Sequence, residues 1–252
     1  MLSKSKIKLI HSLNRKKDRD ESGIFLVEGI KMVEETLRSD FNIVLLVCST
    51  KFANQHPEIQ FRVKEIIESD SESIQKASLL QNPQDVLAIV SQNLNIKPEL
   101  NLQNELLLAL DFIQDPGNLG TILRIADWFG IQTVICSENT VDVYNPKVVQ
   151  ASMGAIFRVK TWYTSLEAFI TKTAIDETPV YGTFLEGKNI YNETLASNGI
   201  IVLGNEGNGI SPEVARLVSH KIYIPSFSSE KSAESLNVAI AAAICCSEFR
   251  RR

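Results

Sequence analysis

Two side chains that could act in catalysis, Asn118 and Arg124, follow an Asp-Pro-Gly turn at residues 115–117. An asparagine amide can order a hydroxyl or a backbone group, and an arginine offers a fixed fork of donors to a phosphate. The two residues are six positions apart, about one and two-thirds helical turns, so they do not share a helix face. The pattern indicates a hydroxyl and phosphate site. The alternative is a capped helix that carries a surface arginine.

A second candidate site is the loop Gly-Asn-Glu-Gly-Asn-Gly-Ile-Ser at residues 204–211. Its three glycines allow a ligand to approach the backbone closely, and Glu206 adds a carboxylate that a simple turn would not need. The glycine order is neither G-x-G-x-x-G nor a Walker A loop, which disfavours a dehydrogenase or a nucleotide hydrolase. The alternative is a tight turn without a ligand.

A third segment begins with Ile-Pro at residues 224–225 and continues through polar residues 226–234. Ser235 and Asn237 then precede the apolar, alanine-rich run 238–246, and either could cap the helix that this run predicts. Taken alone, the segment indicates a capped helix that packs close to neighbouring backbone.

The elements that must position these loops alternate along the second half of the chain. Expected strands cover residues 106–112, 133–136, part of 156–163, 180–184, 200–203 and 222–224, and expected helices cover 119–129, 146–153, 166–175, 212–219 and 236–249. This alternation predicts an α/β fold, with a parallel sheet covered by helices on both faces. In such a sheet the loops after the strands meet at one edge and carry the ligand site.

The first 90 residues predict a smaller α/β domain. A helix is expected at 4–13, a charged turn at 15–22, strands at 24–27, 43–47, 61–67 and 86–90, and helices at 30–37 and 71–80. The asparagine-rich stretch that follows indicates a linker. We therefore expect an N-terminal domain over 1–97, a linker over 98–104 and a second domain over 105–252.

Charge is distributed unevenly along the chain. The net charge is −4, which argues against a protein that coats nucleic acid generally, but residues 1–19 hold seven Lys and Arg and one Asp. A cationic terminus on an acidic body can attract a phosphate backbone locally; the alternative is simply a solvated terminus. The candidate RNA contacts are Lys4, Lys8, Arg15, Lys16 and Lys17.

Cysteine and histidine usage argues against a metal site. The four cysteines form no C-x-x-C pair and lie in or beside apolar runs, and the three histidines lie far apart, so we expect reduced core cysteines and no bound metal. The longest apolar run, 238–246, has nine residues, whereas a membrane helix needs about 20. With no secretory signal evident, the expected location is the cytoplasm.

The three motifs resemble, in order, the signature motifs of the SpoU/TrmH family of RNA ribose 2′-O-methyltransferases, which belongs to the SPOUT superfamily. They are N-x-G-x-x-x-R, then G-N-E-G-N-G-I-S, then I-P followed by S-L-N-V-A-I-A-A-A-I, and the resemblance covers residues 106–252. Phe25–Gly29, with Lys31 and Glu35, is similar to the substrate-binding domain often fused to this family.

The resemblance implies a C-terminal domain with a deep trefoil knot and a mostly parallel sheet, joined to a smaller N-terminal RNA-binding domain. It implies a homodimer, methylation of a ribose 2′-hydroxyl in RNA, and S-adenosylmethionine as cofactor, held at Gly204, Ile224 and Leu236. Ribosomal RNA is the expected substrate, with transfer RNA as the alternative.

The resemblance also assigns five residues to the reaction. Arg124 would clamp a phosphate, since an arginine is not readily deprotonated, and Asn118 would lie near the target ribose. Glu206 and Ser235 would order the loops or the hydroxyl, and Asn237 would fix the hydrogen bonds of the knot.

The chain departs from the family pattern in the stretch Ser226–Glu234, which is longer than usual and has no glycine. This stretch could form a lid over the cofactor or hinder its binding. A catalytically silent RNA-binding or ribosome-associated module of the same fold is therefore a second hypothesis. A nicotinamide-dependent oxidoreductase is a third, and it fits only the α/β pattern.

Overall fold

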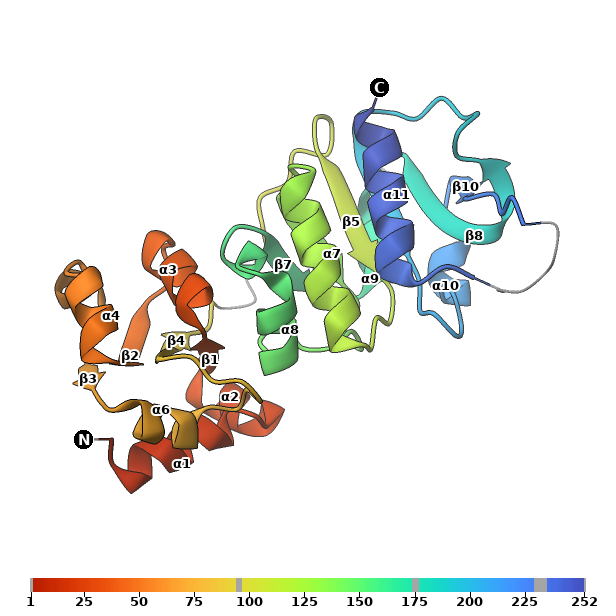
Figure 1. Ribbon diagram of the computed structural model, residues 1–252. Coiled ribbons are helices and arrows are strands. Elements are labelled where there is room, and N and C mark those ends of the chain that lie inside the picture. Colours follow the sequence, from red (N-terminus) through yellow and green to blue (C-terminus); the bar gives the residue numbers. More distant parts are fainter. Residues whose placement is uncertain (1, 94–96, 174–176, 229–234, 252) are drawn as a thin grey trace. The chain divides into compact units, whose positions relative to one another are not determined.

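The computed structural model describes residues 2–93, 97–173, 177–228 and 235–251. The chain divides into two compact units, Met1–Leu94 with Asp142–Arg158, and Asn95–Val141 with Val159–Arg252 (Figure 1). A segment from the middle of the sequence thus belongs to the same unit as the N-terminal residues.

The first unit is built on a four-stranded sheet. Its strands are β1 (Ile24–Glu28), β2 (Ile43–Cys48), β3 (Ile66–Glu68) and β4 (Val86–Ser91), in the order β1-β4-β2-β3. Strand β4 runs antiparallel to β1 and β2, and β2 runs parallel to β3. The helices of this unit are α1 (Lys4–Ser12), α2 (Lys16–Ser22), α3 (Ile30–Arg38), α4 (Thr50–Gln55), α5 (Ile59–Arg62), α6 (Ser71–Ala77) and α8 (Pro146–Ser152).

Two local predictions in this unit were wrong. The expected turn at 15–22 is the helix α2, which is supported by ion pairs one helical turn apart, Lys16 with Asp20 and Lys17 with Glu21. The expected strand at 61–67 is mostly not a strand: Phe61 lies in α5 and is 92% exposed, and only β3 remains. The short alternation of apolar residues at 61–67 does not distinguish a strand from a short helix.

The cationic N-terminus is packed into the first unit rather than extended as an arm. Leu2, Ile10 and Leu13 are buried in its core. Arg19, only 1% exposed, donates to the carbonyls of Leu13 and Asn14 and to the Asp142 carboxylate at 2.5 Å. A buried guanidinium therefore ties α1 and α2 to the segment 142–158.

The second unit contains a six-stranded sheet in which every paired strand is parallel to its neighbours. Its strands are β5 (Leu106–Leu110), β6 (Thr133–Cys136), β7 (Lys160–Tyr163), β8 (Val180–Asn189), β9 (Gly199–Leu203) and β10 (His220–Tyr223), in the order β10-β8-β9-β5-β6-β7. This arrangement confirms the predicted α/β fold.

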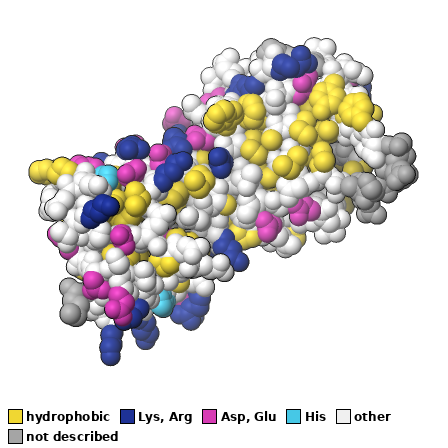
Figure 2. Space-filling model, viewed as in Figure 1, with side chains coloured by type: hydrophobic (Ala, Val, Ile, Leu, Met, Phe, Trp, Pro, Cys, Tyr) yellow, Lys and Arg dark blue, Asp and Glu magenta, His cyan; other side chains and the backbone are white. Residues whose placement is uncertain are grey.

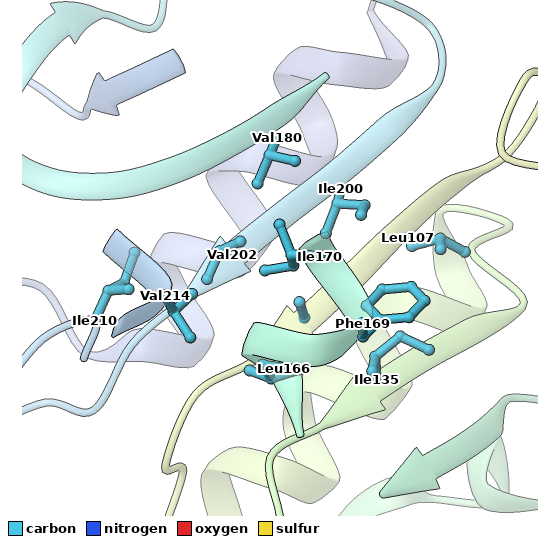
Figure 3. Close-up of a cluster of buried hydrophobic side chains, with 11 residues drawn as sticks. Leu107, Ile135, Leu166, Phe169, Ile170, Val180, Ile200, Val202, Ile210 and Val214 are labelled. Carbon is cyan, nitrogen blue, oxygen red and sulfur yellow. The ribbon is translucent and has the colours of Figure 1, made fainter. Parts of the chain in front are cut away.

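Helices cover both faces of this sheet, as expected. On one face, α9 (Leu166–Thr173) and α10 (Pro212–Ala215) pack over alternate residues of the central strands, in the cluster of buried side chains drawn in Figure 3. On the other face, α7 (Pro116–Trp128) and α11 (Val238–Arg250) lie side by side (Figure 1). Leu100 and Leu102 also pack against the cluster under α9.

All four cysteines are buried and free, which confirms the expected reduced core cysteines. Burial raises the pKa of the Cys136 thiol to about 12, and burial together with the Glu68 carboxylate raises that of Cys48 to about 11. None of the helices in the described ranges is both long and apolar enough to span a membrane.

Candidate active site

The first predicted motif lies where β5 leads into α7, at the carboxyl edge of the parallel sheet. Asp115 caps the helix: its carboxylate accepts from the backbone N–H of Asn118 at 2.8 Å, and Pro116 occupies the first turn. Because the cap is supplied by Asp115, the amide of Asn118 is free for other contacts.

Asn118, Glu206 and Asn237 form a hydrogen-bonded cluster, which we call the amide–carboxylate cluster. The side-chain Nδ2 of Asn118 donates to Oε1 of Glu206 at 2.5 Å, and Nδ2 of Asn237 donates to the same oxygen at 2.9 Å. Nδ2 of Asn237 also lies 2.9 Å from Oδ1 of Asn118. The structure thus brings together one residue from each of the three motifs.

The orientation of the Asn237 amide is fixed by the helix that it begins. Its Oδ1 accepts from the backbone N–H groups of Ala239 and Ile240, at 3.0 and 3.3 Å, and so caps α11. Because the oxygen faces the helix, the NH₂ group must face Glu206. Of the two caps that the sequence allowed, the structure therefore uses Asn237.

Asn205 shapes the glycine loop that carries Glu206, although sequence reasoning did not single it out. Its Oδ1 accepts from the backbone of Gly207 and Asn208, at 2.8 and 3.1 Å, and its Nδ2 donates to the carbonyl of Phe112 at 2.9 Å. Two backbone hydrogen bonds with Gly209 close the loop. An asparagine directly before the loop carboxylate was the available signal, since asparagine often organises turns.

The cluster borders a pocket of about 250 Å³. Its lining residues come from the β5–α7 and β9–α10 loops and the start of α11: Ile113, Gln114, Asp115, Asn118, Asn205, Glu206, Gly207 and Val238. Two carboxylates and several amides face this space, so it can orient a hydroxyl group by hydrogen bonds. Asp115 is a second lining residue that sequence reasoning missed; an Asp before Pro at a helix start was its signal.

Two of the five predicted catalytic residues lie outside the amide–carboxylate cluster. Arg124 is an exposed residue of α7, and its guanidinium has no hydrogen bond or ion pair within the part of the chain that the structure describes. Ser235 is exposed and lies two residues before Asn237. Neither lines the pocket.

The predicted cofactor residues lie on the loops at the same edge of the sheet. Gly204 follows β9 and Ile224 follows β10, and both strands run parallel to β8 between them. A Cβ at Gly204 would lie 2.2 Å from the carbonyl carbon of Gly209, so the closed loop requires glycine there. Leu236 is 49% exposed beside Asn237. Of the long stretch Ser226–Glu234, residues 229–234 lie outside the described residues.

The predicted RNA contacts lie on α1 and α2. Lys4 and Lys8 are exposed one helical turn apart on α1. Arg15, Lys16 and Lys17 pair with Asp18, Asp20 and Glu21 at 2.5, 3.7 and 3.7 Å. Exposed pairs of this kind are weak, so these three cations remain able to meet a phosphate. No group of three or more potential His, Cys, Asp or Glu metal ligands occurs among the described residues.

Two family models match the chain. The SpoU rRNA Methylase family matches residues 105–247, and the MRM3-like substrate binding domain matches residues 4–88. Among curated relatives, the 23S rRNA (guanosine(2553)-2′-O)-methyltransferase RlmP of Bacillus subtilis is 29% identical over 249 residues, which cover 97% of this chain and 96% of that protein.

Solved structures of similar proteins agree with this assignment. An RNA methyltransferase described as a TrmH-family member, from Porphyromonas gingivalis, is 40% identical with a TM-score of 0.88, and the match covers 100% of this chain and 99% of that one. An AdoMet-bound rRNA methyltransferase from Sinorhizobium meliloti is 31% identical with a TM-score of 0.86, covering 100% and 97%. On its motifs, its fold and these matches, the chain belongs to the SpoU rRNA methylase family.

Proposed function

We propose that this chain methylates a ribose 2′-hydroxyl of ribosomal RNA, with S-adenosylmethionine as the methyl donor. The observation that carries the proposal is the amide–carboxylate cluster, which joins all three family motifs at the carboxyl edge of the parallel sheet. The names of the relatives from B. subtilis and S. meliloti support ribosomal RNA as the substrate.

The residues at this edge fit the proposed cofactor. Gly204, Ile224 and Leu236 would hold it, and Leu236 offers an exposed apolar side chain next to the cluster, where a planar ring could pack. When bound, S-adenosylmethionine supplies a methyl group whose carbon–sulfur bond breaks as the ribose oxygen bonds to the carbon. The AdoMet-bound relative supports this assignment.

Glu206 is placed to orient the ribose hydroxyl, which is a weak nucleophile and must lose its proton during the transfer. Oε1 of Glu206 already accepts from two amides, whereas Oε2 has no hydrogen-bond partner within the described ranges. We propose that Oε2 accepts a hydrogen bond from the ribose hydroxyl. Arg124 clamps a phosphate of the RNA, and an oxygen of that phosphate accepts the proton that the hydroxyl loses.

We further propose that the chain acts as a homodimer through the face formed by α7 and α11. Trp128 on α7 and Ile240 on α11 are 84% and 52% exposed, and Figure 2 shows apolar side chains gathered over these two helices. A contiguous apolar patch on a protein surface is typical of an interaction site. The proposal has three further parts. Residues 105–252 form a trefoil knot, and residues 98–104 join them to a separate RNA-binding domain over 1–97. The location is the cytoplasm.

The test is methyl transfer in vitro. The full chain is incubated with labelled S-adenosylmethionine and either ribosomal or transfer RNA from a strain that lacks the gene, and the methylated position is mapped. We expect label in one ribose of ribosomal RNA. Binding of ribosomal RNA without incorporation of label would instead identify a catalytically silent module, and label in transfer RNA alone would change the substrate.

A further inference from the structure

A second pocket, of about 370 Å³, lies within the first unit and shares no lining residue with the pocket at the amide–carboxylate cluster. One wall comes from α8, and the rest comes from β1, the residues before α2 and the connection between α6 and β4. Its surface is mostly apolar, with Leu26, Leu79, Leu80 and Val149 among its lining residues. Its volume lies near the lower end of the range for small-molecule sites, about 300–1,000 Å³.

Three polar side chains at this pocket have no hydrogen-bond partner among the described residues. They are the amides of Asn14 and Gln150 and the ammonium group of Lys147. Glu28 also lines the pocket and is 6% exposed; its carboxylate accepts from the Ser78 hydroxyl and the Leu79 backbone. An apolar pocket with a few unpaired polar groups is typical of a ligand site.

The pocket is held in shape by contacts of α8 and the residues before it. Arg19 pairs with Asp142 at 2.5 Å, and the rings of Phe25 and Tyr144 are 4.6 Å apart. Arg158, after α8, forms an ion pair with Glu35 of α3. Both walls therefore belong to one packed unit, and a ligand would meet a preformed site.

We propose that this pocket binds one unpaired nucleotide of the RNA substrate. The leucines and Val149 pack against the base, the amides of Asn14 and Gln150 bond to its edge, and Lys147 contacts the phosphate. RNA sequence is read mainly from bases that have left the stack, through packing on their faces and hydrogen bonds to their edges.

The surrounding charge favours RNA over another ligand. Arg15, Lys16 and Lys17 follow Asn14 directly in the sequence, at the start of α2. A neutral heterocycle beside a phosphate suits an apolar pocket with amides and an ammonium group at its surface. This inference rests on the proposed function, because it names the part of the chain that selects the RNA.

The test compares three forms of the full chain for binding of ribosomal RNA across a range of salt concentrations. Ala151→Phe adds a ring to a residue that lines the pocket, and we expect it to weaken RNA binding about tenfold or more. Lys147→Gln removes one phosphate contact and lowers the slope of log affinity against log salt by about one. Lys51→Gln, an exposed lysine of α4 away from the pocket lining, is the matched control and leaves the slope unchanged.

Urea unfolding, followed by circular dichroism, reports whether each variant is folded. If wild type methylates ribosomal RNA and both pocket variants keep the wild-type affinity and salt slope, the pocket proposal is wrong and the proposed function stands. If wild type neither binds nor methylates ribosomal RNA, both proposals are rejected. If Ala151→Phe is unfolded, Lys147→Gln alone decides.

Discussion

At the scale of single residues, the placement of Glu206 is unusual because two asparagines donate to the same carboxylate oxygen. Both Nδ2 atoms lie within 2.9 Å of Oε1. A charged oxygen satisfies two donors well, and hydrogen bonds to charged groups contribute about 1.5–3 kcal/mol each. Glu206 therefore holds the three loops together through these two hydrogen bonds.

Glu206→Gln removes the negative charge and should lower kcat for methyl transfer about tenfold or more. A rise of about 1.4 kcal/mol in the activation free energy is enough for a tenfold effect. The measurement is single-turnover incorporation of labelled methyl into ribosomal RNA. Glu213→Gln, an exposed glutamate of α10, is the control and should retain wild-type kcat. Wild-type turnover by Glu206→Gln would refute the assigned role.

Arg124→Ala should leave the fold and the affinity for S-adenosylmethionine unchanged while lowering methyl transfer about tenfold or more. The Arg124 side chain is exposed on α7 and forms no hydrogen bond or ion pair with the described residues, so its removal breaks no such contact there. Calorimetry with the cofactor and turnover with RNA separate the two effects. Near-normal turnover would mean that Arg124 does not clamp a phosphate.

At the scale of secondary structure, the sequence predicted most strands but not all of the connections. The continuous apolar runs at β2, β4, β5 and β9 are buried strands, as expected. Helix α2 carries Arg19, which reaches Asp142, 123 residues away. No local pattern reveals such a contact.

The candidate site was likewise predictable from the sequence only in part. That three loops would meet at one sheet edge follows from parallel strands alone. Which side chains touch does not, because Asn118 and Asn237 are 119 residues apart. Asp115, directly before Pro116, caps α7, a role that the sequence analysis did not give it.

Asp142→Asn tests the buried connection between α2 and the segment that leads into α8. Arg19 is 1% and Asp142 13% exposed, and breaking a buried pair by removing one charge costs about 3–5 kcal/mol. We expect urea unfolding, followed by circular dichroism, to show that the free energy of unfolding of the first unit falls by this amount. Asp20→Asn removes only the exposed partner of Lys16 and should cost less than about 1 kcal/mol.

At the scale of the whole molecule, the exposed face of α7 and α11 predicts the oligomeric state. The chain has a mass of 28.1 kDa, so light scattering of the wild type should give about twice that value for a symmetric dimer. Trp128→Glu places a charge on the apolar face and should shift the mass toward a monomer. A monomeric wild type would contradict the proposed dimer, and a dimeric Trp128→Glu would place the interface elsewhere.

The amide–carboxylate cluster also sets a condition on synthesis. Domains fold from the N-terminus as the chain leaves the ribosome, but the cluster needs Asn237, which caps the last helix of a 252-residue chain. Nascent or C-terminally truncated chains can therefore fold the first unit and yet lack an assembled site. An RNA methyltransferase with this layout acquires its activity only after Asn237 and the helix that it caps, α11, have been synthesised.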